Sequence, residues 1–117
     1  MKDWKEDARM TTTMTRNDLV AKELHRELAE RLRVEPIFVI SRALRNIPKK
    51  RSVSTGGARD AIARWEQLLR RRDIKKIREV FLGDDEDSRM MRNSTVFQGV
   101  LTQRERDQIL ADLKRAA

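Results

Sequence analysis

Apolar residues recur every three or four positions along most of this chain, and no stretch shows the two-residue alternation of a half-buried strand. The chain has 117 residues, with no tyrosine, three phenylalanines and two tryptophans. A core made mainly of Leu, Ile, Val, Ala and Met favours helices over strands. The sequence therefore predicts an all-α protein: a flexible arm over 1–14, then one domain over 15–117, a compact bundle of five or six short helices.

The first helix has recognisable ends. Thr15 or Asn17 can cap its start. Pro36 disfavours helical geometry at the residue before it, so the helix should end by about Val34. Its inward stripe is expected to consist of Val20, Leu24, Leu28 and Leu32.

Two prolines bound the second helix. Pro36 suits its first position, where the missing N–H costs nothing, and Pro48 is expected to stop it. Residues 48–57 are then predicted to be a loop. The buried stripe of this helix is expected to be Ile37, Ile40, Leu44 and Ile47.

Further helices follow from apolar spacing and capping signals. One covers about 58–71 and directs Trp65 inward. The next three are expected after Asp73, after the acidic run 84–87 and after Thr102. The last is the best marked, because Thr102 and Glu105 form a capping box.

The net charge of +8 is concentrated in the middle third of the chain. Residues 42–78 carry thirteen basic and three acidic side chains, whereas the flanking thirds are neutral or slightly acidic. A basic segment between such flanks points to a polyanionic partner, although an acidic protein surface could satisfy the same charges. The candidate nucleic-acid contacts are Arg42, Arg45, Lys49, Lys50, Arg51, Arg70, Arg71, Arg72, Lys75 and Lys76.

Two segments are candidates for protein contact. The arm 1–14 has no apolar period of its own, and its Trp4 and Met10 can dock on a partner or a second copy. Residues 92–101 are interpreted as an ordered loop that either joins two helices or presents contacts to a partner. Those loop contacts would be Arg92, Asn93 and Gln98.

Signals for catalysis and for metal or membrane binding are absent from the sequence. There is no cysteine, the single His25 has no partner motif, and the run 84–87 lacks the calcium-loop pattern. Neither a signal peptide nor a membrane-length apolar run is present. We therefore expect a cytoplasmic protein that is not an enzyme and has no cofactor.

Residues 28–45 partly fit a bacterial helix-turn-helix. Ala29 and Val39 occupy packing positions of that motif. Arg33 stands where the turn favours glycine, and Arg42 falls where an apolar residue is expected. A plain helical hairpin is slightly favoured over a working DNA reader, in which Arg42 and Arg45 would contact bases.

Three stretches carry a resemblance to known proteins. They are 24–47, with Leu24-His25-Arg26, Ala29, Leu32, Pro36, Val39-Ile40, Ala43 and Asn46-Ile47; 65–77, with Trp65, Leu68-Leu69, Ile74 and Ile77; and 91–106, with Met91 to Thr102 and Glu105-Arg106. In these positions the chain resembles a family of small bacterial and phage proteins, some described as antitoxin-like or as helix-turn-helix proteins. That family is expected to have proline where Val96 stands. The resemblance implies an intracellular two-gene module in which such a protein restrains a toxin or regulates transcription.

Charge and resemblance together predict an antitoxin-like or regulatory binding protein. It would neutralise a protein partner, such as a toxin, and contact DNA or RNA through its basic middle third. The alternative is a protein-only inhibitor or adaptor whose basic face binds an acidic protein. A homodimer is possible in either case.

Overall fold

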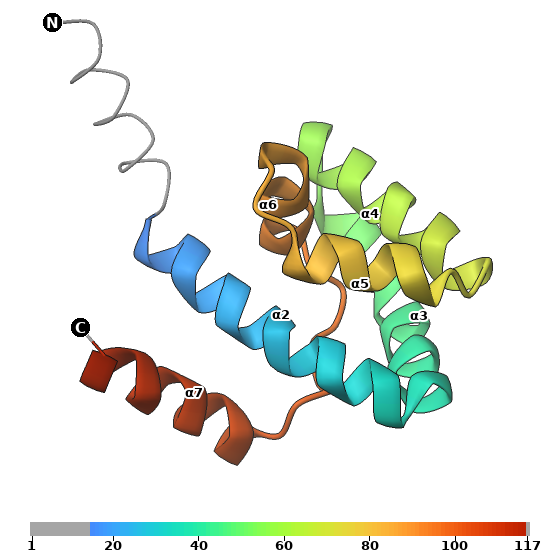
Figure 1. Ribbon diagram of the computed structural model, residues 1–117. Helices are drawn as coiled ribbons and strands as arrows, with labels where there is room; N and C mark the ends of the chain where they lie inside the picture. The colour runs from blue at the N-terminus through green and yellow to red at the C-terminus, as the bar shows by residue number, and fades with distance from the viewer. Residues whose placement is uncertain (1–14, 117) are drawn as a thin grey trace, which may run out of the picture.

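The computed structural model describes residues 15–116, which form six α-helices and no strand (Figure 1). The helices are α2 (Arg16–Val34), α3 (Pro36–Val53), α4 (Gly56–Arg70), α5 (Ile74–Leu82), α6 (Glu86–Asn93) and α7 (Gln103–Ala116). The predicted all-α class is confirmed. The arm 1–14, with the predicted partner contacts Trp4 and Met10, lies outside the described residues.

The helices pack in layers around α5 and α6. These two short helices lie between α2 on one side and α4 on the other, and each contacts both. α3 packs against α2 and α4, while α7 lies alongside α2 at the lower left of the molecule (Figure 1). The buried apolar residues of α2 to α6 and of the segment before α7 form a single hydrophobic cluster.

An aromatic cluster forms the centre of this core. Trp65 of α4 is 0% exposed, and its ring centroid lies 5.8 Å from that of Phe81 and 5.0 Å from that of Phe97. The Trp65 indole N–H donates to the backbone oxygen of Met91 over 2.9 Å. The predicted inward position of Trp65 is confirmed.

Local capping sets the ends of the helices much as the sequence predicts. Thr15 and Asp18 form a reciprocal capping box at the start of α2, which ends at Val34. Thr102 and Glu105 form the same arrangement before α7, with N···O distances of 2.9 and 3.1 Å. Asp73 caps α5 and Asp85 caps α6. The side chains of these capping residues accept hydrogen bonds from backbone N–H groups that have no partner within the helix.

The prediction of a loop over 48–57, with Pro48 ending the helix, is wrong. α3 continues through Pro48 to Val53, and only residues 54 and 55 separate it from α4. The proline removes one backbone hydrogen bond, but contacts further along hold the last turn. Arg51 forms an ion pair with Glu66 of α4, and the Ser52 hydroxyl donates to the backbone oxygen of Lys49 over 2.7 Å.

The prediction of the buried face of α3 is wrong in part. Ile40 and Ile47 are buried, but Ile37 is 73% exposed and Leu44 is half-buried. Successive residues of a helix lie 100° apart, so the apolar run 37–40 cannot all face one side. Val39 and Ala43 complete the buried face instead.

Gly83 has no room for a side chain. A Cβ there would lie 2.9 Å from the backbone oxygen of Glu79 and 2.8 Å from the Asp85 carboxylate, and would touch the Ser88 hydroxyl.

We expect Gly83→Ala to lower the free energy of unfolding by about 1–3 kcal/mol, because the α5–α6 connection must shift. Urea unfolding measures this. The control is Gly57→Ala in α4, where nothing lies within 4 Å; there alanine should be neutral or stabilising. Equal effects at both positions would contradict this account.

Candidate functional site

α3 carries five basic residues and no acidic residue in its 18 positions. Helical spacing places Phe38, Arg42, Arg45 and Lys49 on one side, opposite the buried Ala43 and Ile47. This outward face is about 16 Å long from its first to its last residue. It therefore presents a row of positive charge headed by one phenyl ring.

The cations of α3 differ in how they are held. Arg42 donates to the Asn46 side-chain oxygen over 3.0 Å and lies so close to Gly99 that a Cβ there would be 2.8 Å from its Nε atom. Arg51 pairs with Glu66. Arg45, Lys49 and Lys50 form no ion pair within the described residues, so their charge is not neutralised by them.

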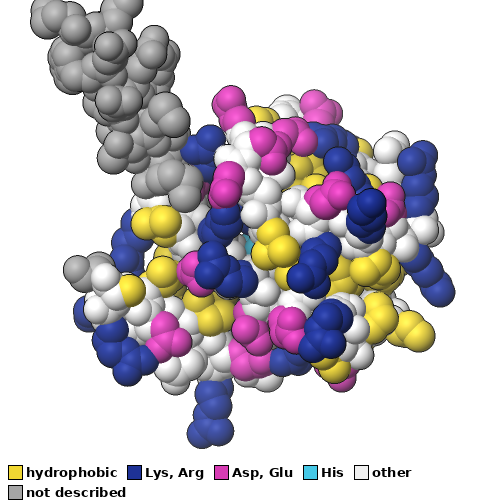
Figure 2. Space-filling view, in the orientation of Figure 1, with side chains coloured by type: hydrophobic (Ala, Val, Ile, Leu, Met, Phe, Trp, Pro, Cys, Tyr) yellow, Lys and Arg dark blue, Asp and Glu magenta, His cyan; other side chains and the backbone are white. Residues whose placement is uncertain are grey.

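The junction of α4 and α5 is the second basic element. Its Arg71, Arg72 and Lys75 are exposed and form no ion pair with a described residue. Arg70 pairs with Glu66 at 2.9 Å and Lys76 with Glu79 at 3.7 Å. Figure 2 shows Lys and Arg side chains gathered at the right-hand edge of the molecule, over this junction.

α3 is linked to α4 and to the α4–α5 junction at two places. Glu66 accepts from both Arg51 of α3 and Arg70 of α4. In addition, a hollow is lined on one side by the first turns of α3 and on the other by Arg72 and Ile74. Six cations of the two elements form no ion pair with any residue in 15–116, and we call them together the basic surface: Arg45, Lys49, Lys50, Arg71, Arg72 and Lys75.

The connection between α2 and α3 is shorter than that of a helix-turn-helix. The two helices are separated by Glu35 alone, whereas the motif has a turn of three or four residues. Arg33, aligned with the turn position, still lies within α2. The geometry favours the helical hairpin, and the Arg42 guanidinium donates to the Asn46 side chain. Base contact by Arg42 and Arg45 stays a prediction.

The prediction that Arg92 is an exposed contact is wrong. Its side chain is 3% exposed, and its Nη1 donates to the backbone oxygens of Val80 and Gly83 over 2.9 and 2.6 Å. The end of α5 has carbonyls without helical partners and a partial negative charge, and the guanidinium meets both needs. Burial lowers the pKa of Arg92. Arg92 thus joins α5 to α6 and is not a surface contact.

Asn93 and Gln98 are exposed but tied to their neighbours. The Asn93 amide donates to Asp18 over 2.9 Å, which holds the pKa of that carboxyl below its usual value. The Gln98 amide donates to the backbone oxygen of Thr95 over 3.2 Å. The Asn46 side chain fixes the same segment to α3 by donating to the backbone oxygens of Val96 and Gln98. The partner contacts predicted at Asn93 and Gln98 stay predictions.

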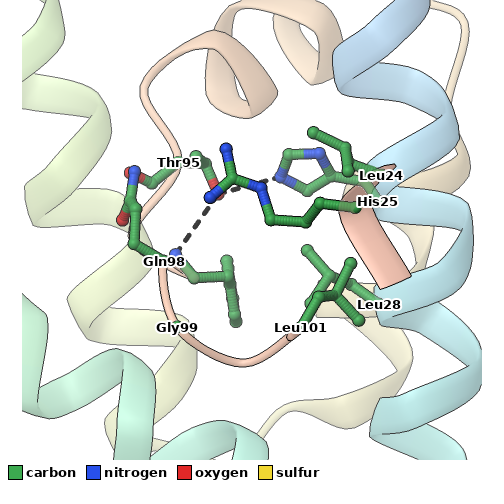
Figure 3. Close-up of a pocket in the computed structure, with 9 residues that line it drawn as sticks. Leu24, His25, Leu28, Thr95, Gln98, Gly99 and Leu101 are labelled. Carbon is green, nitrogen blue, oxygen red and sulfur yellow. Dashed lines mark hydrogen bonds between the residues drawn. The ribbon is translucent and has the colours of Figure 1, made fainter. Parts of the chain in front are cut away.

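His25 belongs to the core. It is 2% exposed, its Nδ1 lies 2.6 Å from the backbone oxygen of Ala21, and its Nε2 lies 2.9 Å from the Thr95 hydroxyl. Burial lowers its pKa to about 4. Figure 3 shows it on α2, where its ring is hydrogen-bonded to Thr95 and both side chains line a small cavity. The cavity has a volume of about 110 Å³ and a largely apolar lining that includes Leu28 and Leu101.

The acidic run 84–87 serves the fold. Asp85 caps α6, Asp87 forms a two-point ion pair with Arg64 at 2.6 Å, and Asp84 pairs with Lys22. Across 15–116, no group of three or more His, Asp or Glu side chains is arranged to hold a metal ion. Over the same residues no helix is long and apolar enough to cross a membrane.

Sequence reasoning missed an exposed apolar corner. Val34 ends α2 and is 60% exposed, and Ile37 and Phe38 of α3 are 73% and 46% exposed. Figure 2 shows hydrophobic side chains at the lower right, where α2 passes into α3. The signal was present in the sequence, because four consecutive apolar residues after Pro36 exceed what one helix face can bury.

Comparison with known proteins finds no match to this chain among family models, curated proteins or solved structures.

Proposed function

We propose that this protein is an antitoxin-like or regulatory binding protein that contacts DNA or RNA through its basic surface and also holds a protein partner. The observation that carries the nucleic-acid part is α3, which has five cations and no carboxylate over 18 residues. Three of those cations, Arg45, Lys49 and Lys50, have no ion pair within the described part of the chain.

The cations of the basic surface form no ion pair with a described carboxylate. Elsewhere in the described chain many basic residues sit beside a carboxylate, as Arg64 does beside Asp87 and Arg31 beside Glu105. On the basic surface, by contrast, like charges lie on adjoining elements. A phosphate backbone would reduce their mutual repulsion and would release condensed counterions on binding. Such contacts position a protein on nucleic acid without reading its sequence.

The second candidate function is a protein-only inhibitor or adaptor. The observation that favours it is the exposed apolar corner, because aliphatic side chains such as Val34 and Ile37 have no counterpart in a phosphate backbone. In that case the basic surface would meet an acidic protein. Salt-dependent binding of nucleic acid distinguishes the two candidates.

We expect the double variant Lys49→Gln/Lys75→Gln to weaken binding to duplex DNA of any sequence. One lysine lies on α3 and the other on α5, so the pair tests whether both elements act as one surface. If both lysines contact phosphates, the slope of log affinity against log salt should fall by about 1.8, since each lost contact removes about 0.9. Fluorescence anisotropy over a salt series measures the slope.

The matched control neutralises two exposed cations of α7, in the variant Arg104→Gln/Lys114→Gln. It changes the net charge equally but leaves the basic surface intact. The two variants should therefore differ in slope. If the wild-type chain is folded by circular dichroism but binds no nucleic acid at low salt, the adaptor function takes precedence.

A further inference from the structure

Three of the seven large apolar side chains that the described part of the chain exposes lie within five consecutive positions. They are Val34, Ile37 and Phe38, at the corner between α2 and α3. Scattered apolar residues on a surface need no explanation, but a contiguous group rimmed by charge marks an interaction site. Phe38 also heads the outward row of cations on α3, so the apolar corner adjoins that row.

A hollow opens beside the corner. It is lined by Pro36, Ile37, Ile40 and Ser41 of α3 and by Arg72 and Ile74 from the α4–α5 junction. Its volume is about 190 Å³. An apolar cavity of roughly 150 Å³ can hold benzene, so this hollow has room for one apolar side chain of a partner. Ile40 and Ile74 supply apolar contacts there.

Arg72 supplies the charged side of the hollow. Its backbone is in the left-handed region, with φ +53°, and hydrogen bonds on both sides fix the junction. The Arg72 N–H donates to the backbone oxygen of Leu69 over 3.1 Å, and the Ile74 N–H donates to that of Arg72 over 2.9 Å. The neighbouring Arg71 and Lys75 add to the positive charge.

The corner has acidic residues of its own, but they are engaged by other cations. Glu30 pairs with Arg33, and Glu35 lies 3.6 Å from Arg31. No described carboxylate forms an ion pair with Arg72. The Arg72 guanidinium is exposed and is therefore available to a carboxylate that an occupant of the hollow brings with it.

We propose that the α2–α3 corner docks an acidic amphipathic helix of a protein partner. One apolar side chain of that helix enters the hollow, its neighbours cover Val34 and Phe38, and a carboxylate on its flank meets Arg72. This is the helix-in-groove mode of recognition, in which apolar residues spaced three or four apart anchor an amphipathic helix. The inference rests on the protein-partner part of the proposed function and not on its nucleic-acid part.

Charge complementarity favours this occupant over the others. A second copy docked by two-fold symmetry would present the same patch to itself, which brings the basic residues of one copy toward those of the other. A nucleic acid would satisfy Arg72 but would leave the aliphatic side chains without apolar partners. An acidic amphipathic helix satisfies both the cation and the apolar side chains.

The test uses the full chain and a synthetic 16-residue peptide with leucines at positions 2, 5, 6, 9, 12 and 13, alanine or glutamate elsewhere. A second peptide carries lysine in place of every glutamate. Isothermal titration calorimetry should show binding of the glutamate peptide and at least tenfold weaker binding of the lysine peptide. No binding of the glutamate peptide, or equal binding of both, would overturn the proposal.

Two variants and a control place the binding site. Ile37→Asp should weaken binding of the glutamate peptide at least tenfold, because it places a carboxylate among the apolar residues that line the hollow. Val53→Asp is the matched control, since Val53 is equally exposed at the other end of α3, and it should bind as the wild type does. Arg72→Asn keeps a residue that tolerates the left-handed backbone and should reduce both affinity and its salt dependence.

Sedimentation of the chain alone completes the test. A concentration-dependent dimer that Ile37→Asp abolishes and Val53→Asp retains would mean that a second copy occupies the corner, and it would overturn the proposal. A monomer that binds the glutamate peptide supports it. None of these measurements contains nucleic acid, so failure here leaves the proposed nucleic-acid contact standing, and the reverse also holds.

Discussion

Replacing Trp65 by alanine is expected to lower the free energy of unfolding by about 3–5 kcal/mol. The side chain is completely buried, so its removal leaves a cavity in addition to the lost transfer free energy. It also contacts Phe81 of α5 and Phe97 of the segment before α7, and its indole N–H donates to the Met91 carbonyl of α6. One substitution therefore loosens the packing of four parts of the fold.

Urea unfolding followed by circular dichroism measures the effect of Trp65→Ala. Trp65→Phe keeps an aromatic ring but loses the hydrogen bond to Met91, so its effect should lie between that of alanine and the wild type. Phe38→Ala is the surface control, because about half of that ring is exposed, and it should cost under about 1 kcal/mol. Similar losses for Trp65→Ala and Phe38→Ala would contradict the central position of Trp65.

The ends of the helices could be predicted because they depend on neighbours in the sequence. A capping box needs only residues three positions apart, and both boxes form, at Thr15 and at Thr102. The inward face of α4 follows in the same way from spacing around Trp65. These features need no knowledge of which helix packs against which.

The errors occur where a distant contact decides the outcome. Pro48 lies inside a helix whose last turn is tied to Glu66 of α4, fifteen residues beyond Arg51. Arg92 is buried because the end of α5 needs a donor, and its sequence neighbours do not reveal that need. The local sequence pattern can identify a polar residue, but it cannot show which backbone carbonyl in another helix that residue will bind.

The composition of the candidate site was predictable, but its assembly was not. The sequence indicates that positive charge gathers in the middle third of the chain. Which cations remain unpaired depends on contacts between helices, as Glu66 shows by engaging Arg51 and Arg70 at once. The position of Arg72 beside the first turns of α3 likewise follows from the packing of the α4–α5 junction.

His25 illustrates the same limit. A lone histidine on a helix can be predicted only as a surface or packing residue, and the structure places it in the core. Its ring lies 5.3 Å from that of Phe81, centroid to centroid, in an edge-on arrangement. The Thr95 contact joins it to a segment seventy residues away. Burial disfavours the protonated imidazolium of His25, so the free energy of unfolding should depend on pH.

We expect the protein to lose about 2.5 kcal/mol of stability between pH 8 and pH 4.5 through His25 alone. Burial is the main cause of its low pKa, about 4 against an ordinary value of 6.5, and the positive charge of Arg92 adds to it. Because the folded state holds the neutral ring, the unfolded chain binds the proton more readily. The stabilisation is therefore complete above pH 6.5 and is lost as the pH falls toward 4.

Urea unfolding at a series of pH values, compared between the wild type and His25→Gln, isolates this contribution. The described carboxyls with lowered pKa values, such as Asp18 and Glu105, have ordinary values of 3.8 and 4.5, so most of their effect falls below the window of interest. The variant should be less stable at pH 8, because it loses ring packing, but its stability should change little between pH 6.5 and 4.5. An imidazole pKa near 6.5 in a proton NMR titration of the folded protein would contradict the prediction. So would parallel stability curves for the two proteins.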